Sequence, residues 1–171
     1  LEEVAGEDAA DLADAGDAAS LKAMLAQTKS VISTVGPYQL YGNELIAACV
    51  ESGTDYFDLC GEPVWMRQMI DKHEAAAKAS GARIVFSCGF DSVPFELGTF
   101  FVQEEAKRVF GAPAARVKGR VRDMRGTLSG GTAASAKATF DAVAKDLSLV
   151  AILNNPFALT PGFEGPKQPR G

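Results

Sequence analysis

One stretch that ends at a glycine–proline pair constrains the fold more than any other feature of the sequence. Residues 31–35 (VISTV) form a short, mostly β-branched run that leads directly into Gly36 and Pro37. Such a run is typical of a strand buried on both faces of a parallel sheet. Proline cannot continue the hydrogen-bonding ladder, so the strand must end there. The chain restarts as a helix near Tyr41, and the pattern predicts a strand, a tight loop and a helix.

The same order of strand, loop and helix occurs twice more along the chain. Residues 55–60 (DYFDLC) lead into GEP and a helix, and residues 83–88 (RIVFSC) lead into GFDSVP and a helix. Strands joined by helical crossovers form parallel sheets, whose carboxyl ends share one edge. We therefore predict an α/β fold with a partial, Rossmann-like parallel sheet. The loops VGPY, DLCGEP and CGFDSVP should converge on one rim, where open α/β sheets bind ligands.

The pattern changes in the last third of the chain. Residues 115–124 alternate charged and apolar side chains, which is typical of a half-exposed strand in an antiparallel sheet. We expect this strand to begin a second, α+β domain. Residues 1–112 are therefore assigned to a partial Rossmann-like domain, and residues 113–171 to the incomplete start of a substrate domain.

Capping and termination signals predict the helices. Asp17 is placed to cap the first of them, proline suits the first turn of the third, and glycine follows several helix ends. The expected helices span residues 18–26, 43–51, 63–80, 95–110 and 133–145, with 147–153 as a possible extension of the last, a weak strand at 9–13 and an irregular tail from 156.

Composition excludes several classes of function. The 171 residues carry a net charge of −5, so no basic face favours nucleic acid as a partner. No apolar run approaches the length of a membrane span, and the acidic, alanine-rich start does not have the pattern expected of a signal peptide. Three cysteines have neither metal-ligand spacing nor an even count. We expect a reduced, cytoplasmic setting without a bound metal.

Two rim loops carry candidate ligand groups, each with a plainer alternative. VGPY offers small residues and backbone N–H groups for a ribose or phosphate, or it is simply a strand-ending turn. Asp58 and Glu62 straddle a glycine turn; they either bond ribose hydroxyls and orient a substrate, or they cap the turn. Asp14 either belongs to the turn before the first helix or lies near the adenine of a dinucleotide.

The third loop and the remaining reactive side chains are weaker candidates. Asp91 and Ser92 precede a helix, where capping competes with a role toward substrate. Cys88 lacks a histidine partner nearby in the sequence that would make it a nucleophile. His73, the single histidine, falls in the middle of a helix, and we expect it to be structural or exposed to solvent.

Three long motifs in order, TVGPYQLYG, GTDYFDLCGE and GARIVFSCGFDSVP, resemble the saccharopine dehydrogenase-like oxidoreductases. The chain is most similar to their bacterial trans-acting enoyl reductase branch, which shares stretches like SGGT and NNPFALTPG. The resemblance extends from about residue 13 to residue 162. It implies a Rossmann domain that binds NADP or NAD, followed by an α+β domain that completes the active site.

The resemblance also implies roles for individual residues. Thr34, Val35, Gly36, Pro37 and Tyr38 would line the dinucleotide site, and Gly89, Phe90 and Asp91 would approach the nicotinamide end. For enoyl reduction the proton donor would be Tyr38 or an ordered water, and Asp91 is the second catalytic candidate because it would orient substrate or nicotinamide.

The expected function is hydride transfer by an NAD(P)-dependent oxidoreductase to a small-molecule or acyl substrate. The family's G-x-x-G-x-x-G loop does not occur in this sequence. We therefore expect the chain to be an internal piece of a longer enzyme, inactive and without useful NAD(P) affinity alone, and prone to self-association. Two alternatives remain: a non-catalytic or lipid-associated scaffold of the same fold, and a saccharopine-type amino-acid dehydrogenase, whose substrate carboxylates would need cations that these loops lack.

Overall fold

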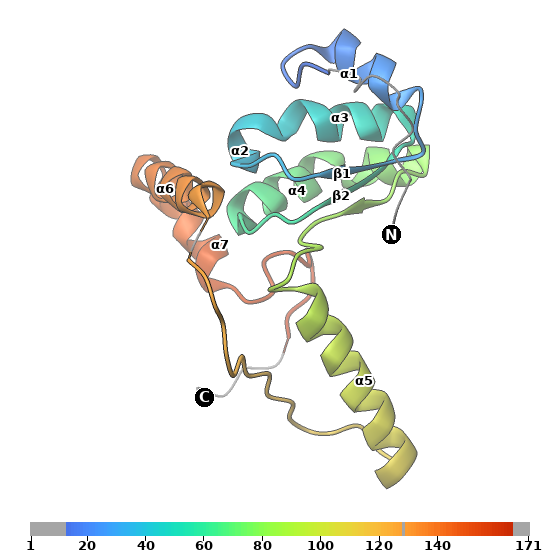
Figure 1. Cartoon of the computed structure of the whole chain (residues 1–171), viewed down its shortest axis with the longest axis vertical. Helices are drawn as coiled ribbons and strands as arrows, with labels where there is room; N and C mark the ends of the chain where they lie inside the picture. The colour runs from blue at the N-terminus through green and yellow to red at the C-terminus, as the bar shows by residue number, and fades with distance from the viewer. Residues whose placement is uncertain (1–12, 128, 166–171) are drawn as a thin grey trace.

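A three-stranded parallel sheet lies at the centre of the protein (Figure 1). The computed structural model describes residues 13–127 and 129–165. The strands β1 (Ser30–Ser33), β2 (Asp55–Asp58) and β3 (Ile84–Val85) lie in the order β1-β2-β3. This confirms the predicted α/β class and a partial Rossmann-like sheet.

Helices cover one face of this sheet. The helix α3 (Asn43–Ser52) and the long helix α4 (Pro63–Ser80) pack against it, and α1 (Ala18–Leu25) lies on α3 (Figure 1). A four-residue helix, α2 (Tyr38–Tyr41), precedes α3 and was not expected from the sequence. The core between helices and sheet is aromatic and aliphatic, with Tyr56, Ile46, Cys49, Trp65 and Met66 almost completely buried.

The predicted capping and helix-ending residues are confirmed at several helix ends. The Asp17 carboxylate accepts a hydrogen bond from the Ala19 N–H at 3.0 Å, so it caps α1. Pro63 stands in the first turn of α4 as expected, and α3 and α4 both end before a glycine in the left-handed conformation. Gly42 is needed for a different reason: a Cβ there would lie 2.6 Å from the Trp65 ring.

The prediction that residues 31–35 are buried on both faces is wrong. Ile32 is 76% exposed, and the register places it beside Phe57, which in turn pairs with Val85. This row lies on the face opposite the core, and no helix of the described part covers it. The strand expected at residues 9–13 falls almost wholly outside the described residues, so no described strand pairs with the outer edge of β1.

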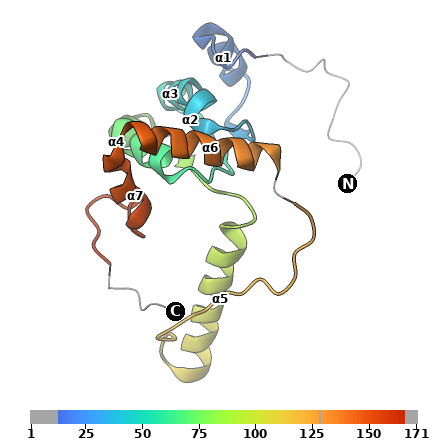
Figure 2. The ribbon, with the colours of Figure 1, turned by 90° about the vertical axis from the view of Figure 1, so that its left-hand side faces the viewer.

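The predicted strand at residues 115–124 is also absent. The segment is irregular and largely exposed, because a period-two pattern becomes a strand only where another strand supplies hydrogen bonds. It links α5 (Val93–Phe110), which extends away from the sheet (Figure 2), to α6 (Gly130–Lys145). The short helices η1 (Leu147–Leu149) and α7 (Val150–Asn154) follow, and residues 156–165 are irregular, as expected.

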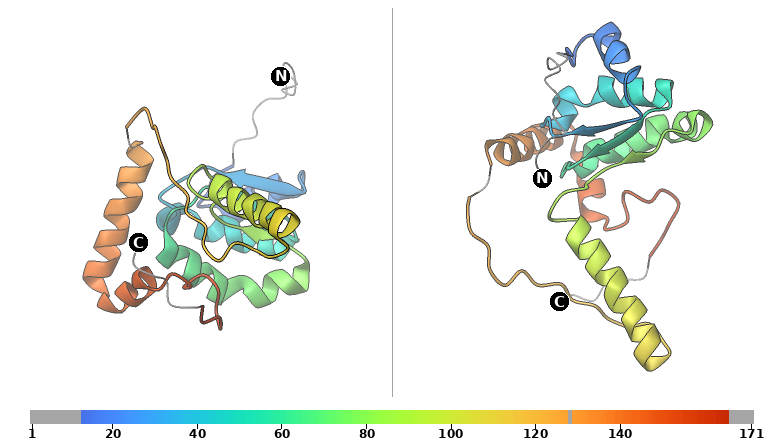
Figure 3. Two further views of the ribbon diagram at one scale, coloured as in Figure 1. Left: turned by 90° about the horizontal axis from the view of Figure 1, so that it is seen from below. Right: turned by 45° about the vertical axis from the view of Figure 1, so that its right-hand side comes forward.

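The helix α6 returns to the sheet domain and lies against α2 (Figure 3). Of the helices in the described ranges, none combines the length and hydropathy that crossing a bilayer requires.

Candidate functional site

A cavity of about 740 Å³ opens where the rim loops meet α6. The loops after β1 and β2 and the turn before α5 form one side of it, as the convergence of strand ends predicts. The other side is α6, from its N-cap Ser129 to Phe140, with Leu153 of α7 beside it. The lining residues are Thr34, Gly36, Tyr38, Leu59, Gly61, Pro63, Gly89, Phe90, Asp91, Ser129, Gly131, Thr132, Ser135, Ala136, Thr139, Phe140 and Leu153.

Six of the predicted site residues are therefore brought together: Thr34, Gly36, Tyr38, Gly89, Phe90 and Asp91. The others lie elsewhere in the described structure. The Val35 side chain is 58% exposed and outside the cavity lining, Pro37 is buried, and Asp14 stands in the turn before α1.

Gly36 leaves room in the cavity wall. A Cβ built on it would lie 3.5 Å from the Tyr38 ring and 3.6 Å from the Ser135 hydroxyl oxygen. These are ordinary contacts, so an alanine fits, but a larger side chain would have to project into the cavity. The absence of a side chain at Gly36 allows a ligand to approach the backbone closely.

Tyr38 contributes its ring to the wall, while its hydroxyl is engaged inside the protein. The residue is 4% exposed, its hydroxyl donates to the Ser33 carbonyl at 3.0 Å, and its ring lies 5.5 Å from that of Trp65. Burial raises the pKa of Tyr38 to about 12. A buried hydroxyl that already donates to a backbone carbonyl is poorly placed to protonate a substrate, so Tyr38 has no acid role in the function proposed below.

Asp58 lies beneath the cavity, at 1% exposure, and organises the loops around it. One carboxylate oxygen accepts from the backbone N–H groups of Cys60 at 3.0 Å and Ser87 at 2.8 Å. The other accepts from the Tyr56 hydroxyl at 2.9 Å. Burial raises the pKa of the Asp58 carboxyl despite these donors. The side chain thus ties the end of β2 to the turn after β3.

Ser87 shows why that turn needs support. It is the one non-glycine residue with positive φ in the described chain, at 59°, a conformation that costs a serine free energy. Its N–H is held by Asp58, and its hydroxyl donates to the Cys60 carbonyl at 2.7 Å. These bonds fix the path of the chain into Gly89 and Phe90.

Glu62 provides the second tie and is equally buried, at 1% exposure. One of its oxygens accepts from the Tyr38 N–H at 2.8 Å and the Ser135 hydroxyl at 2.7 Å. The other accepts from the N–H of Gln39 at 3.0 Å and from its side-chain amide at 2.9 Å. Asp58 and Glu62 therefore bond protein groups, which fits the structural alternative for this turn more closely than direct ribose contact.

Asp91 is the exposed ionisable group of the cavity lining, and its carboxylate has no hydrogen bond among the described residues. Ser92 occupies the N-cap position of α5, yet its side chain makes no capping bond. Phe90, beside Asp91, is 66% exposed and offers an aromatic surface.

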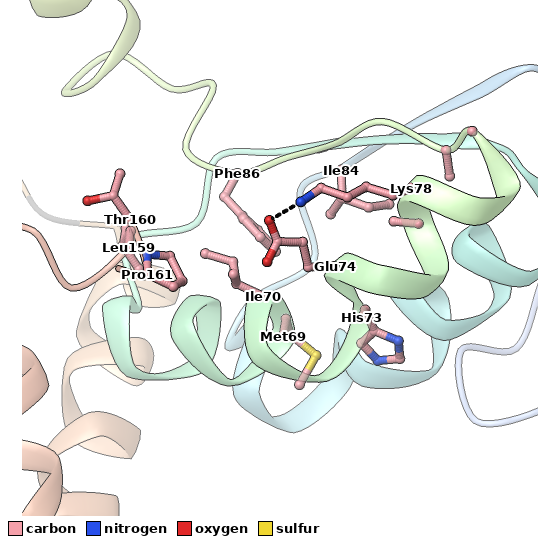
Figure 4. A pocket seen from close by; sticks show the side chains of 13 residues that line it. Met69, Ile70, His73, Glu74, Lys78, Ile84, Phe86, Leu159, Thr160 and Pro161 are labelled. Carbon is pink, nitrogen blue, oxygen red and sulfur yellow. Dashed lines mark hydrogen bonds and ion pairs between the residues drawn. The ribbon is translucent and has the colours of Figure 1, made fainter. Parts of the chain in front are cut away.

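The other reactive candidates lie outside this cavity. Cys88 is exposed, and its thiol donates weak hydrogen bonds to the carbonyls of Val85 and Phe86. His73 lines a separate, largely apolar cavity of about 550 Å³ between α4, β3 and residues 159–161, beside an ion pair of Glu74 and Lys78 (Figure 4). No cluster of metal-ligating side chains occurs within residues 13–127 and 129–165.

The role of α6 was missed at the sequence level. Ser135 and Thr139 face the rim one helical turn apart, and Phe140 and Leu153 add apolar surface. The only local signal was the SGGT loop at the start of α6, whose Ser129 hydroxyl accepts from the Thr132 N–H at 3.1 Å and caps the helix.

Comparison with known proteins identifies relatives. Residues 9–85 match the family described as saccharopine dehydrogenase NADP binding domain. A Mycobacterium tuberculosis protein named "Putative trans-acting enoyl reductase" is 41% identical over 149 residues, which are 87% of this chain and 36% of that protein. The trans-acting enoyl reductase of Mycobacterium leprae is 49% identical over 89 residues, 52% of this chain and 21% of that protein.

A third relative, the trans-acting enoyl reductase of Mycobacterium ulcerans, is 35% identical over 150 residues, 87% of this chain and 36% of its own length. The chain thus spans about a third of the length of the curated relatives it matches. No solved structure matches significantly. The family confirms the expected resemblance and NADP or NAD as its cofactor.

Proposed function

We propose that the rim cavity receives the nicotinamide end of NADP or NAD in an oxidoreductase, because residues 9–85 match the family described as saccharopine dehydrogenase NADP binding domain. We infer further that the reaction is reduction of an enoyl group. The second inference rests on the names of the relatives, which are trans-acting enoyl reductases.

The observation that carries the proposal is the meeting of three rim loops around one cavity at the carboxyl ends of parallel strands. Gly36 stands in one of its walls, so a flat ring can approach the backbone there. Gly89 has a packing role instead, because a Cβ there would lie 3.2 Å from the Cβ of Leu59. The residues present therefore fit a nicotinamide and its ribose.

The chemistry of the lining favours a substrate without negative charge at the reacting end. Among the described lining residues there is no lysine, arginine or histidine, and Asp91 is the only carboxylate. A dicarboxylic amino acid would bring anionic groups into this cavity without a partner, at considerable cost. Exposed apolar side chains of Phe90, Phe140 and Leu153 suit an acyl chain instead.

When bound, the reduced nicotinamide supplies the hydride, and the protein's task is to position and shield the reactants. Gly36 admits the ring, Phe90 and Phe140 exclude water, and the Asp91 carboxylate orients the nicotinamide amide or the substrate. The buried ties from Asp58 and Glu62 keep these walls in place.

Saturation-transfer NMR with millimolar NADPH tests the proposal, because this method detects weak binding. We expect saturation to reach the nicotinamide protons more strongly than the adenine protons. Gly36→Val should abolish the nicotinamide signal, whereas Gly98→Val, at an open position on α5, should preserve it. Stronger saturation of adenine, or an unchanged signal in folded Gly36→Val, would contradict the assignment. No transfer at all, even at millimolar NADPH, would contradict nicotinamide binding in this cavity.

A further inference from the structure

Glu62 is a buried carboxylate without a cationic partner in the described part of the chain. It stands at the N-cap position of α4, yet its side chain does not cap that helix. None of the ion pairs formed within the described ranges includes it. Four hydrogen-bond donors surround it instead, from Tyr38, Gln39 and Ser135. Burying a carboxylate costs free energy, and the hydrogen bonds offset that cost only if every donor is used.

Both oxygens of the Glu62 carboxylate must accept hydrogen bonds. The Tyr38 N–H meets one oxygen and the Gln39 N–H meets the other. Backbone N–H groups cannot reverse their polarity, unlike hydroxyls and side-chain amides. A glutamine at this position would therefore point its NH₂ group at one of these two N–H groups, whichever way its amide turned.

Few hydrogen bonds hold the helix on the far side of Glu62, although α6 also packs against α2 and the following helix α7 packs against α4. No residue of α6 is buried, and only two side-chain hydrogen bonds join α6 to the rim among the described residues. The Ser135 hydroxyl donates to Glu62 at 2.7 Å, and the Gln39 side-chain amide donates to the Thr139 hydroxyl at 3.4 Å. Gln39 is itself oriented by Glu62. Both polar links between α6 and the sheet domain thus pass through this one carboxylate.

We propose that Glu62 is a positioning residue that fixes α6 across the cavity and thereby sets the distance between its two walls. It touches no cavity ligand itself; it acts through Ser135 and Gln39. Losing it frees α6, opens the cavity and weakens contact with whatever the cavity binds. The ligand part of this inference rests on the proposed nicotinamide site, whereas the attachment of α6 does not.

Amide hydrogen exchange of residues 130–145, read by mass spectrometry, tests the attachment. A helix without buried residues is marginal once it is undocked, so Glu62→Gln should speed exchange in α6 by roughly tenfold or more, the equivalent of one charge-assisted hydrogen bond. Glu51→Gln is the matched control, because Glu51 pairs with Lys22 at the surface and should leave α6 unchanged.

A second pair of variants keeps the test decisive if Glu62→Gln does not fold. Ser135→Ala removes only the α6 side of the tie and should speed exchange in α6 alone. Ser135→Thr retains the hydroxyl and should restore protection, while Ser148→Ala, which removes an exposed hydroxyl, serves as the control. Unchanged α6 protection in Ser135→Ala, or equal loss in Ser135→Ala and Ser135→Thr, would overturn the inference.

Saturation transfer from NADPH separates this inference from the proposed function. We expect the nicotinamide signal to fall in Glu62→Gln and Ser135→Ala and to return in Ser135→Thr. If the unsubstituted chain shows no nicotinamide signal, the proposed function fails while the exchange result still decides the role of Glu62. If the signal is present and α6 protection is unaffected by these variants, the role of Glu62 fails alone.

Discussion

Replacing Asp58 by alanine and by asparagine should have very different consequences, because of how its three donors are distributed. Both backbone N–H groups, from Cys60 and Ser87, meet the same carboxylate oxygen, and only the Tyr56 hydroxyl meets the other. An asparagine can keep its carbonyl oxygen on the two N–H groups and turn its NH₂ toward the tyrosine. The Tyr56 hydroxyl can then rotate and accept, since a hydroxyl is both donor and acceptor.

The magnitudes follow from the groups left unpaired. Asp58→Ala strands two buried N–H groups at about 1–3 kcal/mol each, so the free energy of unfolding should fall by about 2–6 kcal/mol. Asp58→Asn should change it by about 1 kcal/mol or less. A loss of the larger size is a substantial share of the stability of a domain, about 5–15 kcal/mol.

Urea unfolding followed by the fluorescence of the single tryptophan, Trp65, measures both variants on one scale. The pH adds a sign. Burial raises the pKa of Asp58, so the stability contributed by its protonated form is complete below about pH 4 and lost as the pH rises through the folded pKa. The free energy of unfolding of Asp58→Asn should therefore rise relative to that of the unsubstituted chain as the pH rises. Equal damage by alanine and asparagine would refute this reasoning.

Three further predictions concern other parts of the fold. Burial, aided by the charge of Lys72, lowers the pKa of His73. The ring protons of His73 should therefore titrate by NMR below about pH 6.5, and the free energy of unfolding should fall as the pH drops below that value. Titration at or above pH 6.5 would contradict the prediction. Gly42→Ala should cost about 1–3 kcal/mol in urea unfolding, because a Cβ would press on the Trp65 ring at 2.6 Å; a cost below this range would show that the ring moves aside freely. Ile32→Lys should reduce self-association measured by light scattering, because Ile32 is exposed on the edge strand of the described sheet. Equal association of both proteins would place the contact elsewhere.

Residues that cap, start or end helices locally explain which features the sequence could predict. Asp17 caps α1, Pro63 opens α4, and Gly53 and Gly81 end α3 and α4, all through interactions within a few residues. The convergence of the three loops follows from parallel topology alone. These features need no knowledge of distant parts of the chain.

Distant partners explain what the sequence could not predict. The Ser135 hydroxyl meets Glu62 across 73 positions, and nothing near either residue indicates the other. Carboxylates are mostly exposed, so a turn with Asp58 and Glu62 suggested ligand contacts or caps rather than buried ties. The alternation at 115–124 indicated a strand, but a local pattern cannot show whether another strand is there to pair with it, and none in the described residues does.

Amide chemical-shift mapping of the chain with NADPH tests the central claim most directly. We predict that the amides of residues 34–36, 38, 59–61, 89–91 and 129–135 shift together, and that nicotinamide mononucleotide reproduces these shifts while adenosine monophosphate does not. Shifts confined to the cavity between α4 and residues 159–161, or produced equally by adenosine monophosphate, would contradict the assignment of the rim cavity to the nicotinamide.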